Sequence, residues 1–222
     1  MKKKIMKAKD PGSAVTHFIG ALMAVFASTP LLIKAASNPG HIHIIALGIF
    51  ILSMILLYSA STIYHTLNIS AKINKRLKKF DHMMIYVLIA GTYTPICLIA
   101  LSGAVGIALL AIIWGLAIIG IIVTGFWVNC PKWFSSAVYI AMGWTCVLAF
   151  TQIINSLSRA AFYWLLAGGI IYTIGGIIYA LKLPLFNGKH KYFGSHEIFH
   201  LFVMGGSLCH FILMYNYIAV MP

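Results

Sequence analysis

The sequence predicts an all-α membrane protein, a bundle of seven transmembrane helices that forms one domain over residues 1–222. Two features of the composition indicate this class: 61% of the residues are hydrophobic and only 9% are charged, whereas a soluble domain carries about 25% charged residues. The third observation is that the apolar residues gather in runs of about 20, the length that crosses a bilayer as an α-helix. A soluble globular class is therefore excluded.

Seven runs are long enough to cross the membrane, and the connections between them are short. They lie at about 14–35, 43–65, 81–101, 104–126, 134–156, 160–181 and 196–219. A short basic tail, residues 1–13, precedes the first run and resembles the start of a signal peptide. The run that follows is long, contains His17 and lacks a small-residue cleavage site. We therefore interpret it as an uncleaved first span.

The basic residues predict the orientation of the bundle. The formal net charge is +13, and of the 16 Lys and Arg residues only Lys34 and Arg159 fall on one side of the predicted membrane. Because basic loops stay in the cytoplasm, the N-terminus is expected there and the C-terminus outside. An odd number of spans requires the same split. Basic residues placed between apolar spans indicate contact with lipid headgroups in the cell membrane rather than with nucleic acid.

The seventh span opens with two histidines, His196 and His200, four residues apart. On an α-helix such residues differ by roughly 40° in direction and about 6 Å along the axis, so both side chains point the same way. Zinc hydrolases use this spacing for two ligands on one helix. Two packed, hydrogen-bonded histidines are the alternative interpretation.

The predicted topology brings further polar residues to the same depth. The second span ends with Ser61 and His65, the third begins with Asp81 and His82, and the seventh begins with His196 and His200. All three ends lie on the cytoplasmic side. Ionisable groups in spans are costly and usually functional, so we expect these side chains to meet in one site.

This set of residues predicts a metal centre with His65, His196 and His200 as ligands. Three protein ligands and one open position are typical of catalytic zinc, although imidazole also suits iron, copper or nickel. Three neutral ligands leave a net charge of about +2, and we expect Asp81 to offset it and to act as general base.

Other polar residues are expected to support this site or to lie outside it. Ser61 lies one turn before His65 and is expected to orient the nucleophile, an imidazole or a substrate carbonyl. Glu197 is the alternative base, but it points roughly 100° away from His196 on the helix. His17 is a candidate for the layer outside the ligands. His210 lies about 15 Å deeper, too far for the same metal, and His43 is expected in a solvated loop.

The quoted motifs together resemble those of a known family. Ser61-x-x-x-His65, Lys79-Phe-Asp81-His82, Ala90-Gly-Thr-Tyr-Thr-Pro95 and His196-x-x-x-His200 are similar to those of the hemolysin III family. This family is the bacterial branch of the progestin and adipoQ receptor family, in a wider group that includes alkaline ceramidases. The resemblance runs from Thr16 to His210.

The resemblance implies a seven-helix protein with zinc near the cytoplasmic end. It matches His65, His196 and His200 to the zinc ligands, Asp81 to the aspartate that holds the zinc-bound water, and Ser61 to the serine of the second-span motif. The eukaryotic relatives carry long N-terminal regions that this short basic tail does not match, so hormone reception is not inferred.

Three functions are compatible with these observations. The first is a zinc-dependent hydrolase that acts on an amide or ester of a membrane lipid at the cytoplasmic side. The second is a non-enzymatic protein with a structural metal, which senses lipid state or permeabilises membranes as the name hemolysin implies. The third is an ion or proton transporter, which the small number of ionisable groups deeper in the spans disfavours. The sequence indicates neither the substrate nor the oligomeric state.

Overall fold

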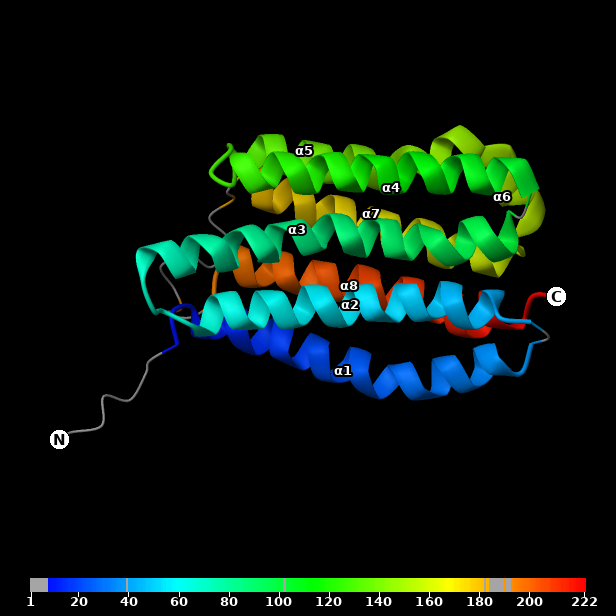
Figure 1. Cartoon of the computed structure of the whole chain (residues 1–222), viewed down its shortest axis with the longest axis horizontal. Coiled ribbons are helices and arrows are strands. Elements are labelled where there is room, and N and C mark those ends of the chain that lie inside the picture. Colours follow the sequence, from blue (N-terminus) through cyan, green and yellow to red (C-terminus); the bar gives the residue numbers. More distant parts are fainter. Residues whose placement is uncertain (1–7, 39, 102, 182, 184–189, 191–192) are drawn as a thin grey trace.

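A computed structural model describes residues 8–38, 40–101, 103–181, 183, 190 and 193–222. Its regular elements are helical throughout this part of the chain, and seven helical segments are long and apolar enough to cross a membrane. They run roughly parallel to one axis, with α1 beginning at one end of the bundle and the C-terminus at the other (Figure 1). The predicted fold class is confirmed, while the side that faces the cytoplasm stays a prediction.

The bounds of the helices follow the apolar runs closely. The first two spans are α1 (Pro11–Ala36) and α2 (Ile42–Thr66). The third is α3 (Ala71–Pro95) with the π-helical η1 (Ile96–Ala100), and the fourth is α4 (Gly103–Phe126). The fifth consists of α5 (Lys132–Gly143), the 3₁₀-helical η2 (Trp144–Ala149) and α6 (Phe150–Ser156). The last two are α7 (Arg159–Leu181) and α8 (Ser195–Asn216), which is followed by η3 (Ile218–Val220).

Helix α3 starts ten residues before the apolar run that predicted it. Ser70 caps its N-terminus, because the Ser70 side chain accepts a hydrogen bond from the Ile73 amide at 3.3 Å. Such a cap satisfies one of the free amides of a first helical turn. The basic residues after the second span therefore lie on the first turns of α3, and not in a loop as expected. Helix α1 likewise begins at Pro11, so the basic tail is shorter than residues 1–13.

Two spans depart from regular α-helix, and each departure has a local cause. Pro95 has no amide hydrogen to donate to the preceding turn, and the chain widens there into η1, where the Leu101 amide bonds to the Ile96 carbonyl at 2.9 Å. In the fifth span, the Tyr93 hydroxyl donates to the Gly143 carbonyl at 2.6 Å and accepts from the Cys146 amide at 2.8 Å. Backbone groups released inside a membrane must find such partners.

The helices divide into an inner and an outer set. Of the most apolar stretch of each span, 67% is buried in the third, 50% in the second and 44% in the seventh, against 28% or less in the other four. In Figure 1, α8 lies behind α2 and α3, between the α1 side and the α4–α7 side of the bundle. The inner helices α2, α3 and α8 carry every residue that the sequence assigned to the metal and to catalysis.

Candidate metal centre

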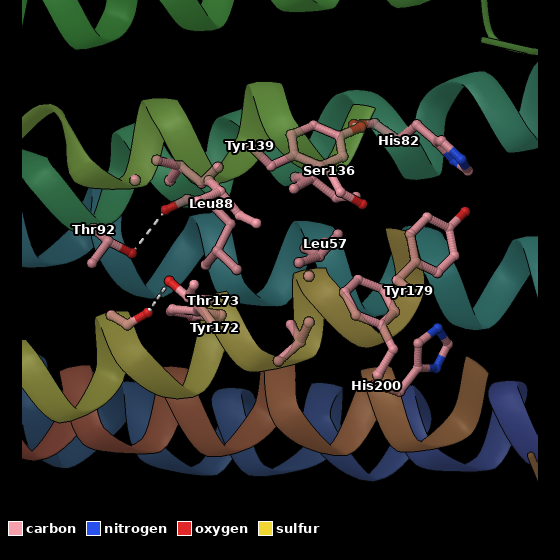
Figure 2. A pocket seen from close by; sticks show the side chains of 18 of the residues that line it. Leu57, His82, Leu88, Thr92, Ser136, Tyr139, Tyr172, Thr173, Tyr179 and His200 are labelled. Atoms are coloured by element: carbon pink, nitrogen blue, oxygen red, sulfur yellow. Dashed lines mark hydrogen bonds between the residues drawn. The ribbon is translucent and has the colours of Figure 1, made fainter. Parts of the chain in front are cut away.

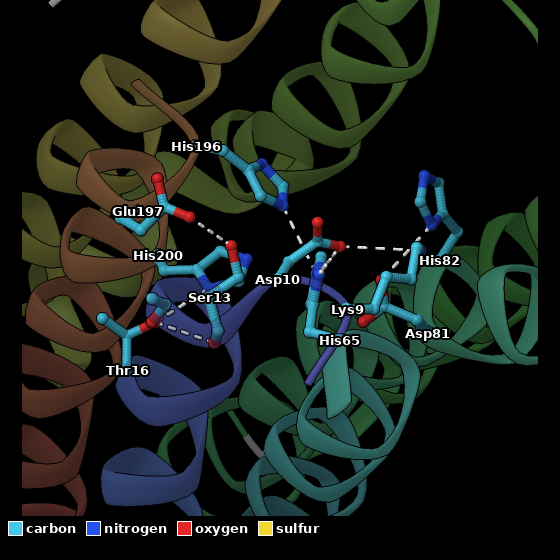
Figure 3. A network of polar contacts seen from close by, with 11 residues as sticks. Lys9, Asp10, Ser13, Thr16, His65, Asp81, His82, His196, Glu197 and His200 are labelled. Carbon is cyan, nitrogen blue, oxygen red and sulfur yellow. Dashed lines mark hydrogen bonds and ion pairs between the residues drawn. The ribbon is translucent and has the colours of Figure 1, made fainter. Parts of the chain in front are cut away.

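Three histidines from two helices meet at the end of the bundle where α1, α3 and α8 begin and α2 ends (Figure 3). His65, His196 and His200 each offer one ring nitrogen as a ligand atom, and these three nitrogens lie within 4.8 Å of one another. The Nε2 atoms of His65 and His196 are 3.3 Å apart. The ring of His200 lies 4.5 Å from that of His196 and 5.3 Å from that of His65, between centroids. The structure thus brings together all three predicted ligands, although His65 and His196 are 131 residues apart in the sequence.

The separation of the nitrogens fits a tetrahedral metal ion. Zinc–nitrogen bonds of about 2.0–2.1 Å at a tetrahedral angle place two ligand nitrogens about 3.3 Å apart. The Nε2 atoms of His65 and His196 have this spacing. At this distance one nitrogen can donate a hydrogen bond to the other, and a cation bound between them would take the place of that proton and accept both lone pairs. Three imidazoles are a suitable donor set for zinc with one position left open.

For two of the ligands, His65 and His200, the hydrogen bond of the other ring nitrogen indicates which atom carries the lone pair. His65 Nδ1 lies 3.0 Å from Asp10 Oδ2, and a carboxylate only accepts, so Nδ1 carries the proton. Thr16 Oγ1 donates to the Ser13 carbonyl at 2.9 Å, and it is therefore the acceptor for His200 Nδ1 at 3.1 Å. Both ligands consequently direct a deprotonated Nε2 away from these partners, as metal ligation requires.

Asp10 is a component of this site that the sequence analysis missed. We assigned it to the tail and placed only Asp81 and Glu197 at this depth, but Asp10 immediately precedes α1 and contacts His65. One signal was present: Asp followed by Pro is a typical helix start, because Asp caps well and Pro suits the first helical position. That signal extends the first span to Pro11 and brings Asp10 to the membrane boundary.

His17 lies directly against one of the ligands, as expected for the layer outside them. Its ring stacks on that of His200, with 3.6 Å between centroids and 9° between planes. His17 is 3% exposed, and neither ring nitrogen has a hydrogen-bond partner among the residues described. It also lines the cavity described next.

A cavity of about 140 Å³ extends into the bundle from His196 and His200, which line it. Figure 2 shows His82, Tyr179 and His200 at one end and Thr92 and Thr173 towards the other. Apolar side chains such as Leu57, Leu88 and Val203 contribute to its wall. A largely apolar chamber with a cluster of histidines and a carboxylate at one end suits a ligand with a polar group and a hydrocarbon part.

Both residues predicted to take part in catalysis line this cavity. Asp81 is 8% exposed, and its Oδ2 lies 3.5 Å from His82 Nδ1. It is within electrostatic range of His17, His65 and His196. Ser61 is 1% exposed, and its hydroxyl has no hydrogen-bond partner in the described part of the chain. The structure therefore places both beside the histidines, and their catalytic roles remain predictions.

Glu197, the alternative base, is engaged in helix contacts. Its Oε1 accepts a hydrogen bond from the Ser13 hydroxyl at 2.5 Å, and its Oε2 accepts one from the Gly194 amide at 2.9 Å. The second bond closes the first turn of α8, as a glutamate at the third helical position commonly does. These contacts join the starts of α1 and α8, a role that needs no proton transfer.

Comparisons with known proteins agree on one family. The sequence model of the family described as "Haemolysin-III related" matches residues 6–211. The chain is 40% identical to Hemolysin-3 of Bacillus cereus over 211 residues, which are 95% of this chain and 92% of that protein. It is 40% identical to the Hemolysin-3 homolog of Bacillus subtilis (strain 168) over 96% of each chain. It is also 23% identical to the adiponectin receptor protein of Drosophila melanogaster, over 91% of this chain and 49% of that protein.

Proposed function

Given that this chain belongs to the hemolysin III family and is a multi-pass protein of the bacterial plasma membrane, we propose that it is a metal-dependent hydrolase for a lipid amide or ester. One observation carries the proposal: three imidazoles converge, and two of them, His196 and His200, line a largely apolar cavity together with the buried carboxylate of Asp81 and the hydroxyl of Ser61, which has no hydrogen-bond partner among the described residues. The distribution of the basic residues predicts that this end faces the cytoplasm.

His65, His196 and His200 would hold the metal through their Nε2 atoms, with zinc the ion that this donor set suits. Bound zinc supplies a Lewis acid that polarises a carbonyl and makes water more acidic. The two nearby carboxylates, of Asp10 and Asp81, offset the positive charge of such a centre close to hydrocarbon.

The residues of the cavity wall supply the remaining functions. The Asp81 carboxylate takes the proton of the attacking water and returns it to the departing amine or alcohol, so one water is consumed and one acid is released. The Ser61 hydroxyl, which has no partner among the described residues, donates a hydrogen bond to the carbonyl oxygen of the substrate. The apolar wall holds the hydrocarbon chain and excludes bulk water.

The test compares two carboxylates at this end of the bundle, those of Asp81 and Glu197, in purified, zinc-loaded protein. We expect Asp81→Asn to lower hydrolysis in a panel of lipid amides and esters by about 100-fold or more while the bound zinc is retained. Glu197→Gln removes an equal charge and is expected to keep most of the activity. Wild type and Asp81→Asn that are equally inert across the panel would refute the hydrolase.

For Ser61, the matched control is another serine on the same helix. Ser61→Ala is expected to lower kcat more than it raises KM, because the hydrogen bond strengthens as charge develops on the oxygen. Ser59, two residues earlier on α2, is expected to tolerate Ser59→Ala because it points to a different side of the helix. Equal effects of the two substitutions would contradict the role of Ser61.

A second function, a non-enzymatic protein with a structural metal, is favoured by the contacts around the ligands. The cluster joins the end of α2 to the start of α8, and α1 contacts both through Asp10 and Thr16. A metal there ties three helices together. In that case His200→Ala unfolds the bundle and Asp81→Ala leaves the physiological effect intact, including any membrane permeabilisation of the kind for which the Bacillus Hemolysin-3 is named.

A further inference from the structure

Asp10 contacts His65 at two points, once through its backbone and once through its side chain. The Asp10 amide donates to the His65 carbonyl at 2.9 Å, and Asp10 Oδ2 accepts from His65 Nδ1 at 3.0 Å. The His65 carbonyl belongs to the last turn of α2, where carbonyls have no partner within the helix. The same residue thus completes the end of α2 and fixes the direction of the His65 ring.

The side chain of Asp10 bonds to His65 and does not cap the helix that Asp10 precedes. Asp10 is the N-cap residue of α1, yet its side chain makes no cap hydrogen bond. A cap of this kind normally stabilises the first turn of a helix. The carboxylate instead turns across to another helix, 55 residues away in sequence, and bonds to a side chain that is 4% exposed. A purely structural helix start does not need this arrangement.

Neighbouring residues hold Asp10 in place. The Lys9 amide donates to the Thr66 carbonyl at 3.3 Å, which continues the backbone contact along the end of α2. Lys9 Nζ lies 3.5 Å from Asp10 Oδ2 and 3.7 Å from the centre of the Tyr64 ring. Figure 3 shows the Asp10 carboxylate next to the ring of His65, with dashed lines that mark its contacts with His65 and Lys9.

We propose that Asp10 is a positioning residue of the metal centre, which acts on the metal through His65. Its carboxylate keeps the proton of His65 on Nδ1 and makes the imidazole a stronger donor at Nε2. Carboxylate–histidine pairs of this kind orient ligands and tune metal sites, and loss of such a partner typically weakens metal binding about 10–100-fold. This inference rests on the proposed metal centre, and it extends that centre to a residue before the first span.

The experiment measures zinc affinity by competition with a chelator in the full-length, detergent-solubilised protein. Asp10→Ala and Asp10→Asn are compared with wild type and with Glu197→Gln. The control removes the same unit of charge from the same end of the bundle, but Glu197 bonds to Ser13 and Gly194 rather than to an imidazole of the cluster. Because the Asp10 side chain is 43% exposed, both substitutions leave no buried cavity.

We expect Asp10→Ala to weaken zinc binding about 10–100-fold, Asp10→Asn to weaken it less, and Glu197→Gln to change it little. The visible absorption bands of the cobalt-loaded protein are expected to shift in the Asp10 variants only, because cobalt reports on the donor strength of its ligands. The unfolding midpoint of the metal-free protein is expected to stay near that of wild type, since the backbone bonds of residue 10 remain.

Two results would overturn the role of Asp10, and a third would overturn the metal centre on which it rests. Wild-type zinc affinity in Asp10→Ala overturns it. Equal weakening in Asp10→Ala and Glu197→Gln overturns it as well, because the effect is then one of net charge. If wild type itself binds no zinc, the proposed metal centre fails, and this outcome is distinct from the first two.

Discussion

Two buried histidines on α8, His200 and His210, show what separates a candidate metal ligand from a structural histidine. They are 2% and 6% exposed. The ring of His200 lies among three other imidazoles, those of His17, His65 and His196, at centroid distances of 3.6–5.3 Å. His210 instead lies beside Tyr172, and its Nε2 donates to the Leu165 carbonyl at 3.2 Å.

The difference between the two residues lies in the direction of their protons. His210 uses Nε2–H to satisfy a backbone carbonyl inside the bundle, and its ring contacts that of Tyr172, whose hydroxyl bonds to the Ser207 hydroxyl. His200 directs its proton outwards to Thr16, and its lone pair faces the cluster. Burial alone therefore does not indicate a metal site, whereas lone pairs that converge from separate helices do.

The largest difference is expected when zinc is added to variants of the two residues. A ligand that binds only the folded state adds about 4 kcal/mol to the free energy of unfolding at 1,000 times its dissociation constant. We expect His200→Ala to lose this zinc-dependent increment and His210→Ala to keep it. Thermal unfolding in detergent with and without zinc measures both. An increment that depends equally on the two histidines would end the distinction.

A smaller effect is expected at the glycine that faces His210. A Cβ atom at Gly168 would overlap the His210 ring, while a Cβ at the adjacent Gly169 meets no atom within 4 Å. Gly168→Ala therefore displaces the ring from the Leu165 carbonyl and is expected to lower the free energy of unfolding by about 1–3 kcal/mol. Zinc affinity should not change. The control, Gly169→Ala, is expected to be nearly neutral in the same unfolding measurement.

The smallest effect is expected at the partner of His200. Thr16→Val keeps the shape of the side chain but removes the oxygen that accepts from His200 Nδ1. We expect about 10-fold weaker zinc binding, the lower end for such partners. The matched control is Thr62→Val, since the Thr62 hydroxyl bonds only to the Tyr58 carbonyl of its own helix among the contacts described. If both substitutions weaken zinc binding alike, Thr16 does not position His200.

The sequence predicted the spans well because apolar length is a strong signal, and it was less reliable where local chemistry decides. The start of α3 depends on the Ser70 cap, which extends a helix into a basic segment that hydropathy assigns to a loop. The break in the fifth span depends on Tyr93 of a different helix. His43 was expected to be solvated, but it is 4% exposed and bonds to the Met221 carbonyl at 3.1 Å. A contact with the far end of the chain leaves no local pattern.

The convergence of the three histidines was predictable for a different reason. Consecutive spans cross the membrane in opposite directions, so an even-numbered span ends on the face where an odd-numbered span begins. The end of the second span and the start of the seventh were therefore expected at one depth. Depth does not determine which residues cross from one helix to another. The contacts of Asp10 and Thr16 depend on how α1 packs against α2 and α8, and no spacing in the sequence gives that packing.

Metal analysis of the purified protein tests the central claim most directly. We expect about one zinc ion per chain in wild type and background levels in His65→Ala and His196→Ala, because each substitution removes one of only three protein ligands. Both variants should still be recovered as folded helical protein. Zinc that is well below one per chain in wild type, and no lower in the two variants, would contradict the claim that these imidazoles form a metal centre.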